Sequence, residues 1–294
     1  MWGLLPIFWK SLSMLDPLYI MAVRVIFSAL FGYVVIAVKG KEGILRDALC
    51  RPKEMIRLAW ASLLITLSWW LYVVAVNTGH ILEAGLGFFM MPTMCLAASA
   101  FLLKEKMNRW ETVSAVIAAS GVMAALFLYG AVPWMALLMC VVFGAYGVIK
   151  KTVSCDGDVS VFIESLYMTA PALLYVFWAE GEGAGAIGVL SGWEWLLLPM
   201  TGVVTAFPLI LFAAGMQGIS FTAASVLMYL DPLIETSVGF LYGEMPSLMM
   251  SVNFGFALVS VGFCIAGTIA RNAAIHRDLR RRLADRKNVT GKEA

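Results

Sequence analysis

Nine long apolar runs dominate the sequence, and they constrain the fold more than any other feature. A membrane-spanning helix needs about 20 mostly apolar residues, and each run comes close to that length. The runs are residues 17–38, 58–76, 81–103, 111–128, 134–149, 160–178, 193–216, 221–242 and 247–270. With 61% hydrophobic and 14% charged residues, the chain carries more apolar surface than a soluble core of its size can enclose. The sequence therefore predicts an all-α integral membrane protein.

The composition also excludes several functions. A net charge of +2 leaves no broad basic face, so we expect no nucleic-acid partner. The cysteines, Cys50, Cys95, Cys140, Cys155 and Cys264, form no CxxC pair, and the only histidines are His80 and His276. We therefore expect no disulfide, no metal site and no cofactor.

The distribution of basic residues predicts the topology. Residues 2–13 are apolar but too short to cross alone, and we interpret them as the end of a first span that is short by about half its length. That gives ten spans. If both termini are cytoplasmic, 19 of the 21 Lys and Arg residues lie in inward loops or the tail, and the outward connections contain none. Such an asymmetry is typical of a multi-pass protein with this orientation.

A weak internal repeat appears at an offset of about 140 residues. It places Pro92 on Pro232, and a helix-end glutamate follows each proline, Glu105 and Glu244. Each copy then holds five spans, and because five is odd the copies must have opposite orientations. Inverted repeats around a midplane cavity are typical of alternating-access transporters.

The repeat divides the chain into three parts. Residues 1–128 form the first five-helix repeat, residues 134–270 form the second, and residues 271–294 form a basic cytoplasmic tail near the lipid headgroups.

Six charged residues fall within or beside the spans, where each charge costs about 2.5–3.5 kcal/mol. They are Lys10, Arg24, Glu83, Glu164, Asp231 and Glu235. Arg24 and Glu164 occupy matching positions of the two repeats. In a functional interpretation Arg24, alone or with Lys10, attracts an anionic solute, and Glu164 or Glu83 carries a proton. In a structural one, Arg24 pairs with one of these carboxylates and holds the repeats together.

Asp231 and Glu235 lie one helical turn apart and share a face. Pro232 lies between them and frees a backbone carbonyl, which predicts a polar, hydrated helix bend with Pro92 as its counterpart. The alternative is that Asp231 extends from a helix end toward the membrane surface. For Trp69 and Trp70, in the run at residues 58–76, lipid contact or packing is the plainer interpretation.

Several motifs resemble a known family. They are Trp2-Gly3-Leu4-Leu5-Pro6, the stretch from Asn77 to Pro92 with Trp70 before it, and Glu164, Tyr229 and Pro232 in the second half. In these the chain resembles the RarD group of the EamA family, in the drug/metabolite transporter superfamily. The resemblance implies ten helices, secondary transport and the bacterial inner membrane. It adds Trp70, Asn77 and Tyr229 to the solute or proton pathway. Lys104-Glu105 departs from the Gly-Glu that is usual at that helix end.

Two classes of function remain. The first is a secondary active transporter, an exporter of a small metabolite or drug-like solute, with the proton as candidate coupling ion. The second is an integral-membrane enzyme that acts on a lipid-linked substrate. No nucleophile or metal-ligand motif in the sequence favours the enzyme, and no nucleotide-binding motif favours an ATP-driven pump. The oligomeric state has no signature in the sequence.

Overall fold

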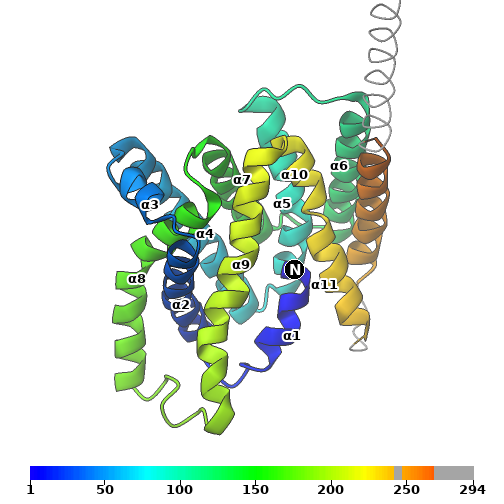
Figure 1. Ribbon diagram of the computed structural model, residues 1–294. Helices are drawn as coiled ribbons and strands as arrows, with labels where there is room; N and C mark the ends of the chain where they lie inside the picture. Colours follow the sequence, from blue (N-terminus) through cyan, green and yellow to red (C-terminus); the bar gives the residue numbers. More distant parts are fainter. Residues whose placement is uncertain (242–246, 268–294) are drawn as a thin grey trace, which may run out of the picture.

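A computed structural model describes residues 1–241 and 247–267 of the chain, and every regular element within them is helical (Figure 1). The elements are η1 (Trp2–Leu4), α1 (Leu5–Lys10), α2 (Pro17–Val38), α3 (Glu42–Leu49), α4 (Pro52–Asn77), α5 (Ile81–Phe101), α6 (Arg109–Tyr129), α7 (Trp134–Thr152), α8 (Gly157–Gly181), η2 (Gly192–Leu196), α9 (Leu197–Gly218), α10 (Phe221–Leu227) and α11 (Leu230–Leu241). A last described helix covers residues 248–267. Glu244 and the tail at residues 271–294 lie outside the described part.

Eight helices in the described residues are long and apolar enough to cross a membrane. This confirms the prediction of an all-α membrane protein. The apolar run at residues 221–242 is not among the eight, because it is divided into α10 and α11. The start of the chain folds as η1 and α1, which are too short to cross alone. The ten-span arrangement stays a prediction.

Local sequence signals set the helix ends. The Asp16 carboxylate accepts two backbone N–H groups at the start of α2, where Pro17 is the first helical residue. Asn108 and Glu111 form a capping box at the start of α6. Gly130 ends α6 with a φ of 75°, a left-handed conformation that glycine adopts without steric cost.

The division between α10 and α11 has a local cause. Pro232 is the third residue of α11 and has no N–H group, so it cannot donate to the carbonyl of Met228 four residues earlier. The N–H of Asp231 donates to that carbonyl instead, at 3.1 Å. A proline is tolerated in the first turn of a helix, and α11 therefore starts just before Pro232. Around Pro92, in contrast, α5 stays helical from Ile81 to Phe101.

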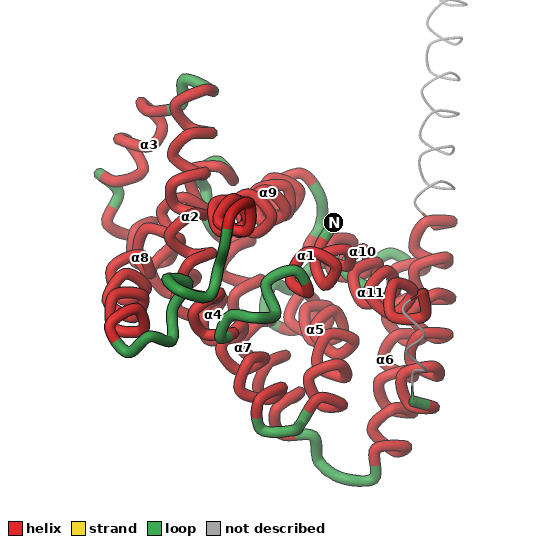
Figure 2. The backbone as a smooth tube through the Cα atoms, turned by 90° about the horizontal axis from the view of Figure 1, so that it is seen from below, coloured by secondary structure: helices red, strands yellow, loops and turns green. Residues whose placement is uncertain are grey.

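The helices pack as one bundle in which α2 lies against α8 and α9, and α5 lies against α7 and α10. Gly202 of α9 allows a close approach to α2: a Cβ there would overlap the backbone of Phe27. The helix at residues 248–267 lies beside α6 at one edge of the bundle, with α3 at the opposite edge (Figures 1 and 2). Hydrogen bonds between Ser114 and Ser260 join α6 to the helix at residues 248–267.

Candidate functional site

A buried ion pair connects α7 to α8. The ammonium of Lys150, in the last turn of α7, donates to Glu164 Oε1 and to the hydroxyl of Ser160. The side chains of Lys150 and Glu164 are only 2% and 5% exposed. Ser160 also donates to Glu164 Oε1 at 2.9 Å, and the hydroxyl of Tyr146 donates to Oε2 at 3.3 Å. Both oxygens of the Glu164 carboxylate are therefore hydrogen-bonded, as a charge buried among apolar helices requires.

The sequence did not predict Lys150 as a site residue, because a lysine at the end of an apolar run is expected in an inward loop. The structure turns its side chain into the bundle. One signal was available: only residues 153–156 separate α7 from α8, and such a short connection keeps the end of α7 close to the start of α8. The end of α7 then lies beside the first turns of α8, at the depth of Glu164.

Arg24 does not pair with Glu164. Its guanidinium carbon lies 3.9 Å from the ring centroid of Trp69 and 5.7 Å from that of Trp9, which is the geometry of a cation–π interaction. Among the described residues no carboxylate lies within ion-pair distance of Arg24, and its buried Nε has no hydrogen-bond partner.

A small cavity of about 20 Å³ joins the surroundings of these two charges. It lies between α2, α4, α8 and α9, and Ser28, Thr66, Trp69 and Glu164 are among the residues that line it. Trp69 is the ring on which Arg24 stacks. Of the two predicted residues that matched in the repeats, Glu164 therefore lines this cavity, whereas Arg24 contacts only a ring that lines it.

Glu83 is held by neutral donors. Its carboxylate accepts the hydroxyl of Tyr129 at 2.8 Å and the backbone N–H of Met135 at 2.9 Å. Glu83 lies in the first turn of α5, Tyr129 ends α6, and Met135 is in the first turn of α7. The residue therefore fastens three helix ends and satisfies one N–H group that α7 cannot pair internally.

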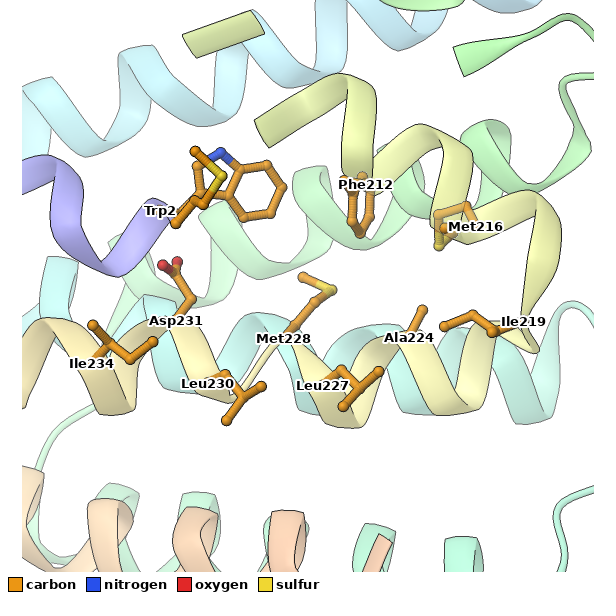
Figure 3. A pocket seen from close by; sticks show the side chains of 12 residues that line it. Trp2, Phe212, Met216, Ile219, Ala224, Leu227, Met228, Leu230, Asp231 and Ile234 are labelled. Carbon is orange, nitrogen blue, oxygen red and sulfur yellow. The ribbon is translucent and has the colours of Figure 1, made fainter. Parts of the chain in front are cut away.

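Asp231 lines the larger cavity, which measures about 270 Å³ between α9, α10, α11 and η1. Figure 3 shows its carboxylate directed toward Trp2, with Phe212 and Met228 on the neighbouring walls. The rings of Trp2 and Phe212 lie 5.4 Å apart. Asp231 Oδ1 is buried and has no hydrogen-bond partner among the described residues.

The other predicted residues lie apart from these cavities. Tyr229 is fully buried at the break between α10 and α11, where its hydroxyl bonds that of Thr93, next to Pro92 in α5. Glu235 is half-buried in α11. Trp70 is 44% exposed, in keeping with a lipid-facing position. Lys10 and Asn77 are exposed at the ends of α1 and α4.

These features define a class: a multi-pass α-helical membrane protein with unusual charges in its interior. The sequence profile of the EamA-like transporter family matches residues 1–127. The uncharacterized transporter YojE of Bacillus subtilis is 38% identical over 83% of this chain and 83% of its own. Protein RarD of Streptomyces exfoliatus is 32% identical over 82% of this chain and 77% of its own. The chain belongs to the EamA-like transporter family, as the resemblance to the RarD group implied.

A protein of known crystal structure has the same fold. It superposes with a TM-score of 0.68, covering 90% of this chain and 92% of that chain, at 19% sequence identity.

Proposed function

We propose that the protein is a secondary active transporter of the bacterial inner membrane, which exports a small metabolite or drug-like solute by alternating access. The observation that carries the proposal is Arg24. Arg24 is a half-buried cation that stacks on indole rings and has no carboxylate beside it in the described residues, so its charge is available to a solute. A relative of the chain is named a transporter, which agrees with a role of Arg24 in solute binding.

The surroundings of Arg24 indicate the class of solute. A guanidinium group binds carboxylates in a bidentate manner, and Trp69 and Trp9 offer flat apolar surfaces next to it. A small anion with a planar or apolar body satisfies both features. Proton coupling would use a buried carboxylate, and Glu164 is the candidate that shares a cavity with Trp69.

The contacts between helices support two inverted repeats, residues 1–128 and 134–270. At an offset of about 140 residues, α2 corresponds to α8, α4 to α9, and the start of the chain to α7. In keeping with this relation, α2 packs on α9 as α8 packs on α4, and α5 packs on α7 as α11 packs on η1. The corresponding helices α2 and α8 pack on each other, as a twofold axis between them requires.

The enzyme alternative would need an activated nucleophile. Ser160 beside Lys150 is the arrangement closest to one, since serine and lysine form a catalytic pair in some hydrolases. In such a pair the serine hydroxyl donates to the lysine, whereas here Lys150 donates to Ser160 and to Glu164. Ser160 is also 1% exposed. This arrangement favours a transporter.

The function is tested by comparing extracellular metabolites of a deletion strain, the same strain that overproduces the protein, and one that overproduces Arg24→Ala. We expect one or more anionic metabolites to accumulate outside with the native protein and not with the variant. Arg24→Lys keeps the charge but not the planar guanidinium that binds a carboxylate through two N–H groups, so it should restore part of the export. Equal metabolite profiles in all strains would contradict export.

The orientation is tested by reporter fusions that are active only outside the cytoplasm. With both termini cytoplasmic, a fusion near Gly183 should be active and one after Arg271 should be silent. The reverse pattern, or activity at both positions, would contradict the ten-span arrangement.

A further inference from the structure

The connection between α7 and α8 is fastened to its neighbours by several bonds. Arg57 of α4 donates to the carbonyl of Thr152 at 3.0 Å, and the N–H of Ser154 donates to Glu54 of the same helix at 3.2 Å. Gln217, at the end of α9, donates to the carbonyl of Cys155 at 2.6 Å. The connection is therefore bonded to both α4 and α9, next to the Lys150–Glu164 pair.

Glu164 lies between two environments. On one side its carboxylate holds Lys150, Ser160 and Tyr146. On the other side the residue lines the small cavity that also contacts Trp69. Lys150 lies closer to the aqueous end, because it belongs to the last turn of α7. A proton that enters the cavity thus reaches Glu164 before it reaches Lys150.

We propose that Lys150 and Glu164 form a proton-operated latch, in which a proton on Glu164 displaces the Lys150 ammonium toward the aqueous end of α7 and releases the α7–α8 connection. The proton binds a carboxylate oxygen, and Lys150 keeps its own protons. The pair therefore passes from zero net charge to +1 while still buried. A buried single charge is strongly unfavourable, and Lys150 is the group that can hydrate by the shortest movement. The latch rests on the proposed function, since it couples proton binding to the opening of one end of the solute path.

The other charges near Glu164 already have opposite partners. From α4, Glu54 is paired with Arg57 at 3.0 Å. At the start of α8, Asp158 is held by Lys39 and Lys41. The further titratable groups are Tyr146 of α7, whose hydroxyl donates to Glu164, and the buried Cys155 thiol in the connection. To the small cavity, α2 contributes Val25 and Ser28 and α9 contributes Leu209, all uncharged.

Cys155 offers a native reporter of the latch. It is 6% exposed when the connection is closed, and release of the connection would expose it. The test uses a variant in which Cys155 is the single cysteine, the other four being replaced by alanine. Its rate of labelling by N-ethylmaleimide is measured between pH 8 and pH 5.5 in the purified protein. A variant with Cys50 as the single cysteine is the matched control, because Cys50 is exposed.

We expect the labelling rate of Cys155, divided by that of Cys50, to rise more than about tenfold as the pH falls, as local opening exposes the thiol. Thiol chemistry alone lowers both rates in parallel, because maleimide reacts with the thiolate and the thiolate fraction falls as the pH falls. A Cys155 rate that falls in parallel with that of Cys50 would overturn the latch.

Two variants separate a latch from a merely structural ion pair. In Glu164→Gln the lysine has no counter-ion, so we expect fast labelling of Cys155 at every pH. In the double variant Lys150→Met, Glu164→Gln no charge has to leave, so labelling should stay slow at every pH. If Glu164→Gln does not fold, the double variant still decides. It lacks both charges, so a labelling rate of Cys155 that rises at acid pH in this variant would overturn the proposal.

The labelling needs no solute, so it separates the two proposals. Acid-dependent labelling in a protein that exports nothing would contradict the proposed function and leave the latch standing. Export by a protein whose relative labelling does not respond to pH would overturn the latch alone.

Discussion

Glu164, which is buried, and Arg24, which is half-buried, are two charges of opposite sign in the same bundle, and the protein accommodates them in different ways. Glu164 has a counter-ion and two hydroxyl donors, so all of its needs are met within the chain. Arg24 has the faces of Trp69 and Trp9 and, in the described residues, no carboxylate. A charge whose hydrogen bonds are all made within the chain has no group left for a ligand, and its stability depends on its counter-ion. A charge that rests on rings can still accept a ligand, because ring faces attract the cation without using its N–H donors.

The sharpest way to break this comparison is to remove the counter-ion. Lys150→Met leaves the Glu164 carboxylate buried and unpaired, and we expect a loss of about 3–5 kcal/mol in the free energy of unfolding. Thermal unfolding of the purified protein in detergent measures it.

The control is the double variant Lys150→Met, Glu164→Gln, which removes both charges. It should recover most of the lost stability, because neutral groups of similar volume can replace a buried pair at little cost. A single variant as stable as the native protein would show that Glu164 is neutral or solvated.

The second test concerns the ring beneath Arg24, and adjacent tryptophans provide a matched pair. Trp69→Leu removes the cation–π interaction and part of a half-buried ring, with an expected cost of about 2 kcal/mol. Trp70 is 44% exposed, so Trp70→Leu should change stability by less than about 0.5 kcal/mol.

The export assay extends this test, because Trp69→Leu should also weaken export of the solutes that depend on Arg24. Equal effects of the two substitutions on stability and export would remove Trp69 from the site.

The fold was largely predictable from sequence, because span length and hydropathy are strong local signals. The run at residues 17–38 coincides with α2, where Pro17 begins the helix and the basic Lys39 follows it. Hydropathy did not reveal the division of the run at 221–242, since a missing N–H group at Pro232 does not change how apolar a segment is.

The site was predicted only in part, for a physical reason. Arg24, Glu164 and Asp231 are conspicuous because charges at membrane depth need an explanation, and the structure places them on internal cavities or rings. Their partners were not predicted. Lys150 sits at a helix end, where sequence reasoning assigns a lysine to water, and only the three-dimensional register of α7 and α8 turns it inward.

A third prediction compares two buried glutamates. Glu83 is held by the Tyr129 hydroxyl and the Met135 N–H, both neutral donors. Glutamine keeps one oxygen acceptor at that position and strands no charge, so Glu83→Gln should cost only about 1 kcal/mol. Glu164→Gln strands Lys150 and should cost several times more.

Thermal unfolding of the two purified variants, side by side, makes the comparison. If Glu83→Gln lowers the unfolding temperature more than Glu164→Gln does, the loss of a counter-ion is not what makes the Glu164 substitution costly.

The smallest expected effect concerns Glu105, outside the spans. Burial acts to raise the pKa of this carboxyl, but donation from the N–H groups of Phe221 and Thr222 and from the hydroxyls of Ser99 and Thr222 outweighs it and lowers the pKa below its usual 4.5. A lowered pKa in the folded state means that the unfolded chain binds the proton more readily. The stabilisation is therefore present above about pH 4.5 and is lost as the pH falls through the folded-state value. Glu105→Gln should destabilise the protein by about 0.5–1 kcal/mol at pH 7, as loss of a helix cap does, and the difference from the native protein should shrink toward pH 3. Unfolding temperatures of both proteins across this range measure it. Because all other carboxylates titrate equally in the two proteins, a difference that stays constant with pH would mean that Glu105 does not cap α10 as a carboxylate.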